Sequence, residues 1–217
     1  MLMTGICICQ GKCVSSATEY SRGMARTREF NYDKAMERAM FLFWKKGYAN
    51  TSLRDLLKAM GIGEGSFYNT FKSKRNAYLE SLKFYDRTVN AERVHAFASQ
   101  PNTAEGVRAF FRTVLNCLDN PKLPRVCLLA GSIAPEVLGE RELRAYMREQ
   151  AAGWAHHMAA RFDADKQRHI LPRDFDSETV ATVIVTFVQG LWRMALISYN
   201  RVKLEHQIET LLTALRL

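Results

Sequence analysis

The chain has 217 residues, of which 47% are hydrophobic, and its formal net charge is +9. This composition is sufficient for a buried core, and no run of about 18 apolar residues predicts a membrane span. The basic excess is concentrated in residues 21–75, where 12 Lys and Arg oppose five Asp and Glu, a net of +7. A local basic excess is typical of polyanion-binding proteins, although a solvated surface would explain it equally well.

The cysteines and the first residues indicate a reducing compartment rather than secretion. Five cysteines make an odd number, and their spacing is unlike a disulfide framework, so we expect a cytoplasmic protein. Residues 1–25 are a poor signal peptide and are expected to form a disordered extension, with Met24 as a natural alternative start. Cys7, Cys9 and Cys13 could bind a soft metal, but no His pair or fourth Cys lies nearby, so we predict no metal and no cofactor.

The first two predicted elements are short helices with local end signals. Asp33 is a plausible N-cap for the first helix, which Gly47 ends. Ser52 and Asp55 have the spacing of a capping box at the start of the second helix. Gly61 then supplies the permissive backbone for a tight turn. This spacing predicts a helix-turn-helix.

The rest of the chain also has helical periodicity. The third helix is expected over about residues 63–70, and Ser73 caps a long fourth helix. Strand signals such as Asn-Gly hairpins are absent from the sequence. We therefore predict an all-α protein of about nine helices, with a three-helix N-terminal domain over 26–75 and a larger helical bundle over 76–217. The later helices are expected over 74–97, 103–118, 126–138 with Pro135 as a kink or stop, 141–162, 177–199 and 203–215.

The third helix has the chemistry of a helix that reads bases in a major groove. Gly65 and Ser66 keep its front low enough to approach base edges, and Asn69 suits adenine. Thr70 can also hydrogen-bond to a base. Glu64 could accept from a cytosine amino group, or could simply favour the dipole of the first helical turn.

Four segments at their particular order and spacing carry a resemblance to a known family. Residues 43–48 (FWKKGY), 51–53 (TSL), 61–68 (GIGEGSFY) and 71–74 (FKSK) resemble the DNA-binding domain of TetR-family transcriptional repressors. The resemblance implies phosphate contacts from Tyr68, Lys74, Thr51 and the amide end of the second helix. The expected DNA-binding residues are Thr51, Ser52, Glu64, Gly65, Ser66, Tyr68, Asn69, Thr70 and Lys74.

The same resemblance implies a homodimer on a palindromic operator and a small-molecule effector in the C-terminal bundle. Most aromatic and sulfur-containing residues of the middle helices could be ordinary core or could line a pocket. The expected pocket residues are Phe110, Phe111, Leu115, Cys127, Tyr146, Trp154, His157, Met158, Phe187 and Trp192. The expected dimer-interface residues are Ile184, Val188, Leu191, Ala195, Ile208, Leu211 and Leu212.

These observations lead to a functional hypothesis with one alternative. We expect a sequence-specific repressor that a small molecule releases from its operator, with double-stranded DNA, the effector and a second copy of the chain as partners and no role for a membrane. The alternative is a regulator that senses an oxidant or electrophile through Cys117 or Cys127. An enzyme is not expected, because no HExxH sequence, phosphate-binding glycine loop or nucleophile elbow occurs.

Overall fold

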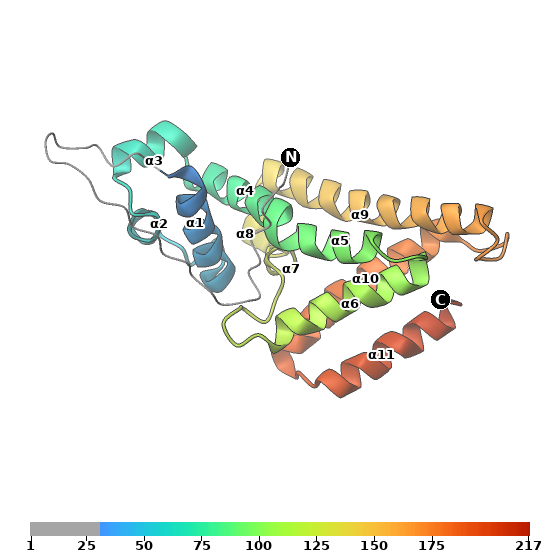
Figure 1. Cartoon of the computed structure of the whole chain (residues 1–217). Coiled ribbons are helices and arrows are strands. Elements are labelled where there is room, and N and C mark those ends of the chain that lie inside the picture. Colours follow the sequence, from blue (N-terminus) through green and yellow to red (C-terminus); the bar gives the residue numbers. More distant parts are fainter. Residues whose placement is uncertain (1–30) are drawn as a thin grey trace, which may run out of the picture.

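A computed structural model describes residues 31–217, and these residues form an all-α fold with no strand among them, as the sequence predicted. The expected N-terminal extension and the Cys7, Cys9 and Cys13 cluster lie outside the described residues. Figure 1 shows α1–α3 at one end of the molecule, with α4 leading from them into the larger bundle. The helices are α1 Tyr32–Lys46, α2 Leu53–Met60, α3 Glu64–Phe71, α4 Lys74–Tyr85, the π segment η1 Asp86–Asn90, α5 Ala91–Ala98, α6 Thr103–Asp119, α7 Leu128–Gly131, α8 Pro135–Leu138, α9 Arg141–Gln167, α10 Ser177–Ile197 and α11 Arg201–Ala214.

The N-terminal helices begin and end at local signals. Asn31 caps α1 by accepting from the Lys34 amide at 3.0 Å, so the expected cap at Asp33 is wrong by two residues. Asp33 instead lies in the first turn, where its carboxylate favours the helix dipole. The capping box of α2 is present as predicted, and Gly61 ends that helix in the left-handed conformation at φ 70°.

A cluster of aromatic side chains holds the three N-terminal helices together and joins them to α4. Phe43, Phe67 and Phe71 are buried, with the Phe67 and Phe71 rings 5.3 Å apart. Phe43 also packs edge-to-face on Tyr78 of α4, with ring centroids 4.7 Å apart. The orientation of α3 is therefore set by a rigid core that continues into α4.

The expected fourth helix, over residues 74–97, is one helical rod with a π segment in its middle. Between α4 and α5 the residues of η1 have the wider π-helical turn, and the Thr88 hydroxyl donates to the Phe84 carbonyl at 2.6 Å. A π segment shifts the faces of the helix on either side of it. Asn90 and Arg93 consequently face the interior of the C-terminal bundle.

The expected sixth segment also divides, and for a clear reason. Pro135 takes the first position of α8, where its missing amide hydrogen costs nothing, so α7 and α8 are separate short helices. Together with the π segment, this division accounts for the difference from the expected count of about nine helices.

The C-terminal bundle is built around α6, which contacts α5, α9 and α11, while α9 packs along α10 (Figure 1). The buried Asp165 near the end of α9 accepts from the Thr103 amide at the start of α6, at 2.6 Å. This bond satisfies one of the unpaired amides of the α6 N-terminus and fixes the two helix ends together. Helix α9 continues to Gln167, five residues beyond its expected end.

Helix α10 is long and apolar enough to cross a membrane by length and composition, and 39% of its most apolar window is buried inside the chain. The apolar core helix of a soluble protein meets the same criterion. Its buried side packs on α9 and α7, and its other side is exposed.

Candidate DNA-binding surface and C-terminal cavity

Helix α3 separates an anchoring face from an exposed polar face. Phe67 and Phe71 are buried, whereas Ser66 and Asn69 are exposed. Tyr68 is 44% exposed although its ring packs edge-to-face on Phe67 at 5.6 Å between centroids, so much of this large aromatic side chain faces outward. The expected base-reading and phosphate-contacting residues that share the exposed surface are Glu64, Gly65, Ser66, Tyr68, Asn69 and Thr70.

Two glycines, Gly63 and Gly65, lie at the front of α3 and leave its backbone uncovered by side chains. A Cβ added to Gly63 or Gly65 would meet no atom within 4 Å, and neither residue has a positive φ. Gly63 is the N-cap of α3, a position where glycine is favoured, but Gly65 lies inside the helix, where glycine costs roughly 1 kcal/mol relative to alanine. The packing of this chain does not require glycine at position 65, whereas a close approach by another molecule would.

Hydrogen bonds within the chain restrict some of the expected DNA-binding side chains. The Thr70 hydroxyl donates to the Ser66 carbonyl at 2.9 Å, so its oxygen can still accept from an outside donor. The Ser52 hydroxyl accepts from the Asp55 amide as the cap of α2, and Ser52 itself is exposed.

Thr51 does not fit its expected role as a phosphate contact. Its side chain is fully buried and donates to the Gly47 carbonyl at 2.7 Å. The hydroxyl stabilises the turn between α1 and α2 and cannot reach a ligand outside the chain. The Ser52 and Asp55 amides are engaged in the capping box, which leaves the other amides of the first turn of α2 to attract an anion.

Two lysines follow α3, and the sequence analysis singled out only one of them. Lys74 is partly buried over the Tyr48 ring, at 4.6 Å from the centroid, and this burial lowers the pKa of its ammonium group. Lys72 is exposed and has a left-handed backbone at φ 65°, which turns the chain between α3 and α4. Its ammonium group donates to the Asn69 carbonyl at the end of α3. Lys72 is therefore closer to the exposed surface of α3 than Lys74.

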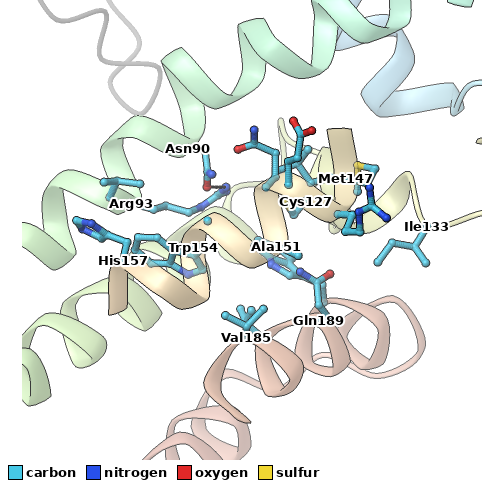
Figure 2. Close-up of a pocket in the computed structure, with 18 of the residues that line it drawn as sticks. Asn90, Arg93, Cys127, Ile133, Met147, Ala151, Trp154, His157, Val185 and Gln189 are labelled. Carbon is cyan, nitrogen blue, oxygen red and sulfur yellow. Dashed lines mark hydrogen bonds between the residues drawn. The ribbon is translucent and has the colours of Figure 1, made fainter. Parts of the chain in front are cut away.

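The C-terminal bundle contains a cavity of about 600 Å³. Figure 2 shows that its labelled wall residues come from η1 and α5, from α9, from α10 and from the segments just before and after α7, which contribute Cys127 and Ile133. Five of the expected pocket residues line it, namely Phe110, Cys127, Trp154, His157 and Trp192. The other expected residues, Phe111, Leu115, Tyr146, Met158 and Phe187, do not line it. Phe111, Leu115 and Met158 are instead buried core, and Phe187 lies on a groove formed with Leu211 of α11.

The polar groups of the cavity wall were missed by the sequence analysis. Asn90, Arg93 and Gln189 line the cavity, and Arg93 is only 4% exposed. Polar residues on apolar helices carry a signal for such a site, but the π segment that directs Asn90 and Arg93 inward leaves no pattern in the sequence.

Arg93 is the centre of a buried polar cluster. Its guanidinium donates to the Tyr85 hydroxyl at 2.8 Å and lies 3.5 Å from the Cys117 sulfur. The Tyr85 hydroxyl in turn donates to the Cys127 sulfur at 3.3 Å. Complete burial raises the pKa of Tyr85 well above its ordinary value, so that Tyr85 stays neutral beside this arginine.

Tyr146 lies beside this cluster rather than in the cavity wall. Its hydroxyl donates to the Asp86 carboxylate in η1. Burial raises the pKa of the Asp86 carboxyl, while the bonds from Tyr146 and Asn90 oppose that shift. Burial and the neighbouring carboxylate also raise the pKa of Tyr146. The pair joins α9 to the π segment.

Most of the expected dimer-interface residues belong to the core of a single chain. Ile184, Val188, Leu191, Ala195, Ile208 and Leu212 are each at most 4% exposed. The periodicity of α10 and α11 correctly marks an apolar face, but that face packs inward against the bundle. Leu211 is the one member of the set that stays partly exposed, on the groove between α10 and α11. The apolar residues left exposed near this end are Met194, Leu196, Ile197 and Val202.

Taken together, a small three-helix unit with an exposed polar helix and an all-α bundle with a cavity define a helix-turn-helix regulator. The model of bacterial regulatory proteins of the tetR family matches residues 35–80. The model of the tetracyclin repressor-like C-terminal domain matches residues 103–211, half of the chain. The chain belongs to the tetR family of DNA-binding transcriptional regulators.

Individual relatives extend this result. The chain is 30% identical over 128 residues to the uncharacterized HTH-type transcriptional regulator YezE of Bacillus subtilis (strain 168), a match that covers 59% of this chain and 66% of YezE. It is 30% identical over 110 residues to the HTH-type transcriptional repressor ComR of Escherichia coli (strain K12), over 50% of this chain and 51% of ComR. The matches thus span less than two thirds of either relative.

Solved structures show the fold over a larger part of the chain. A cysteine-substituted form of the TetR-family regulator CifR, complexed with 26-bp double-strand operator DNA, has a TM-score of 0.78 and 29% identity. That match covers 87% of this chain and 99% of CifR. The reduced form of E. coli NemR has a TM-score of 0.73 at 19% identity, which supports the fold alone.

Proposed function

We propose that this protein is a dimeric transcriptional repressor that binds a palindromic operator through α3 and is released when a small molecule occupies the cavity of the C-terminal bundle. The observation that carries the proposal is the exposed face of α3, where small and hydrogen-bonding side chains stand on a rigid aromatic core. The CifR structure with operator DNA supports the same use of the fold.

The exposed residues divide by the part of DNA that each can reach. Ser66 and Asn69 have side chains suited to base edges, with Gly65 permitting the approach. Tyr68 and Lys72 are suited to phosphates, which fix the register of the protein on the duplex but do not read sequence. One such helix contacts few base pairs, so a symmetric pair of them on a palindrome supplies specificity.

The dimer would use the surface of α10 and α11 that the protomer leaves exposed. Phe187 and Leu211 line a groove there, and Met194 and Ile197 are 55% and 80% exposed. A second copy of the chain would cover these apolar side chains, and their burial would supply the driving force.

Communication between the cavity and α3 would pass through α4. The Tyr78 hydroxyl of α4 bonds to Ser132 after α7 at 2.5 Å, and Arg75 at its start pairs with Glu140 at 3.7 Å. At its other end α4 runs into the π segment that places Asn90 in the cavity wall. A ligand that binds the DNA-free arrangement better than the DNA-bound one then weakens operator binding by that difference.

The first experiment measures binding of the purified protein to a fluorescent duplex from the region upstream of its own gene, and to a scrambled duplex, at 50 and 200 mM salt. We expect a dimer to bind a palindrome in that region, with an affinity that falls by roughly 10³-fold or more over this range through counterion release. Equal binding to both duplexes would show that the operator does not lie in this upstream region. No preference after selection from random sequences would refute the proposal.

A second candidate function is sensing of an oxidant or electrophile by Cys127 or Cys117. The observation that favours it is the Arg93 guanidinium 3.5 Å from the Cys117 sulfur, because a nearby cation stabilises a thiolate. Both cysteines are 7% exposed, which restricts access. Mass spectrometry after treatment with N-ethylmaleimide tests this function, and labelling of neither thiol under native conditions would refute it.

A further inference from the structure

The cavity wall contains a buried positive charge with no paired carboxylate. Arg93 is 4% exposed, and among residues 31–217 no carboxylate oxygen lies within ion-pair distance of its guanidinium. Its hydrogen-bond partners are the Tyr85 hydroxyl, the Asn90 side-chain oxygen and the Cys117 sulfur, all of which are neutral groups or weak acceptors. A buried charge without a counter-ion is costly to a fold, so a counter-ion from outside would stabilise it.

The nearest acidic group is already engaged elsewhere. Asp86 accepts from the Tyr146 hydroxyl with one oxygen and from the Asn90 amide at 3.2 Å with the other. It acts on Arg93 only through its charge at a distance. The negative charge of Asp86 therefore offsets part of the positive charge of Arg93, but Asp86 forms no hydrogen bond to the guanidinium.

Two further polar atoms in the same wall are buried without a hydrogen-bond partner. They are the indole Nε1 of Trp154, which can only donate, and the side-chain Oε1 of Gln189, which can only accept. Buried polar atoms are nearly always paired in native proteins, so two unpaired atoms on one cavity are unusual. Figure 2 shows Trp154 and Gln189 around the same space that Arg93 faces.

The remaining surroundings indicate the rest of the ligand. The cavity of about 600 Å³ lies within the usual size of small-molecule sites, and Phe110, Val185 and Val188 contribute apolar wall. Of the charged residues on the wall, Arg144 and Arg148 are basic and only Glu149 is acidic, so the field favours an entering anion.

We propose that the cavity binds an amphipathic monocarboxylate: an apolar aliphatic or aromatic acid whose carboxylate pairs with Arg93 and whose body fills the apolar part of the cavity. The Trp154 indole donates to a ligand oxygen, and Gln189 accepts from a ligand hydroxyl or amide where one is present. Arg144 and Arg148 are exposed, whereas Arg93 is the buried guanidinium of the wall, so one buried positive charge is available to the ligand, which favours a monocarboxylate over a doubly charged phosphate ester. The proposal names the class of effector for the function proposed above and rests on that function only for its regulatory meaning.

The experiment compares acids with their uncharged amides by isothermal titration calorimetry on the full chain without DNA. The probes are octanoate and octanamide, 4-phenylbutanoate and 4-phenylbutanamide, and 2-naphthylacetate and 2-naphthylacetamide. We expect at least one acid to bind tenfold or more tightly than its amide in the unmodified protein. The preference should survive in Arg112→Met, which removes an exposed arginine away from the cavity, and should vanish in Arg93→Met. Equal binding of acids and amides, binding of no acid, or a preference that survives Arg93→Met would overturn the proposal.

Two additional measurements separate binding from folding. Arg93→Met should keep its helical circular dichroism and a cooperative melt in the absence of ligand, because it loses hydrogen bonds to neutral groups and ring contacts but also removes a buried charge that has no carboxylate partner. A lower melting temperature with unchanged acid preference would make Arg93 a purely structural residue. Trp154→Phe, which keeps a ring but removes the indole N–H, should weaken acid binding several-fold, and an unchanged affinity would remove Trp154 from the site.

Operator binding is measured in parallel, so the two proposals can fail separately. Release of the operator by neutral compounds and not by acids would overturn the ligand class and leave the repressor function in place. Acid binding by a protein that selects no DNA sequence would refute the repressor function and leave the proposed ligand class in place.

Discussion

The N-terminal unit and the C-terminal bundle differ in where their polar side chains lie and in whether the buried ones have hydrogen-bond partners. Within residues 31–73 no buried side-chain nitrogen or oxygen lacks a hydrogen-bond partner, and the polar face of α3 points to solvent. Arg75 Nε, at the start of the connecting helix α4, is one such unpaired atom. The bundle contains three such atoms, on Thr103, Trp154 and Gln189, together with the buried charge of Arg93. Unpaired groups in a core reduce stability. The comparison indicates that one region presents its chemistry outward on a stable platform, while the other holds an interior site at a cost to its fold.

If the N-terminal unit is a platform, removing its central ring should abolish DNA binding. Phe67→Ala deletes a fully buried phenyl ring and should destabilise this unit by about 3–5 kcal/mol. Chemical denaturation followed by circular dichroism measures the loss. Cavity ligands should still bind the variant, since Phe67 does not line the cavity. Loss of ligand binding as well would show that the two regions fold as one unit.

The packing of Tyr78, where α4 connects the N-terminal unit to the bundle, should lose stability at alkaline pH. Burial raises the pKa of Tyr78 to about 12, and its ring lies between Phe43 and the Ser132 hydroxyl. Because the folded pKa is above the unfolded value of 10.0, this contribution is complete below pH 10 and is lost as the pH rises from 10 towards 12. The free energy of unfolding should fall by about 2–3 kcal/mol, because a pKa difference of about two units is worth 1.36 kcal/mol per unit.

Urea denaturation of the unmodified protein and of Tyr78→Phe, at pH 8 and pH 11, measures this effect. Tyr78→Phe should be less stable than the unmodified protein at pH 8 by about 1 kcal/mol, through loss of one hydrogen bond, and the gap should narrow at pH 11. A gap that widens with pH would contradict the assignment.

The exposed face of α3 should contain base contacts, whose loss lowers sequence discrimination, and phosphate contacts, whose loss lowers affinity for every sequence. Asn69→Ala should lower the discrimination between operator and mutated operator by about 1–3 kcal/mol, whereas Tyr68→Ala should weaken binding to all duplexes alike. Fluorescence anisotropy on matched duplexes measures both. An equal loss of specific and nonspecific binding in both variants would remove Asn69 from base reading.

The capping box of α2 offers a smaller test of the same platform. Ser52→Ala removes the hydroxyl that accepts from the Asp55 amide and should cost about 1 kcal/mol of stability. Ser52→Thr keeps the cap and is the matched control. Thermal melts of the two variants should therefore differ, and equal melting temperatures would show that the cap contributes nothing measurable.

Local interactions explain what could be read in advance at the N-terminal end. The capping box, the left-handed Gly61 and the buried positions of Phe67 and Phe71 depend on residues three or four apart, and each leaves a pattern in the sequence. Thr51 shows the limit even here. Its residue type suits a phosphate contact, but packing buries it against the Gly47 carbonyl.

In the bundle, residue type predicted less. Ile184 and Leu212 have the periodicity of an interface, yet the same periodicity serves the core of one chain, and only the packing of α10 and α11 distinguishes the two. Trp154 and Phe110 reach the cavity while Met158 and Phe111 do not, although each pair lies on the same helix, α9 or α6.

The amino-acid sequence by itself determined the all-α class, the helix boundaries that caps and glycines specify, and the helix-turn-helix, because these depend on interactions within a few residues. Only the tertiary structure decided which side of α10 is covered, which aromatic residues surround a cavity, and that Arg93 is buried in its wall. Those features depend on a π segment and on contacts between helices far apart in the chain, where many apolar patterns are compatible with several packings.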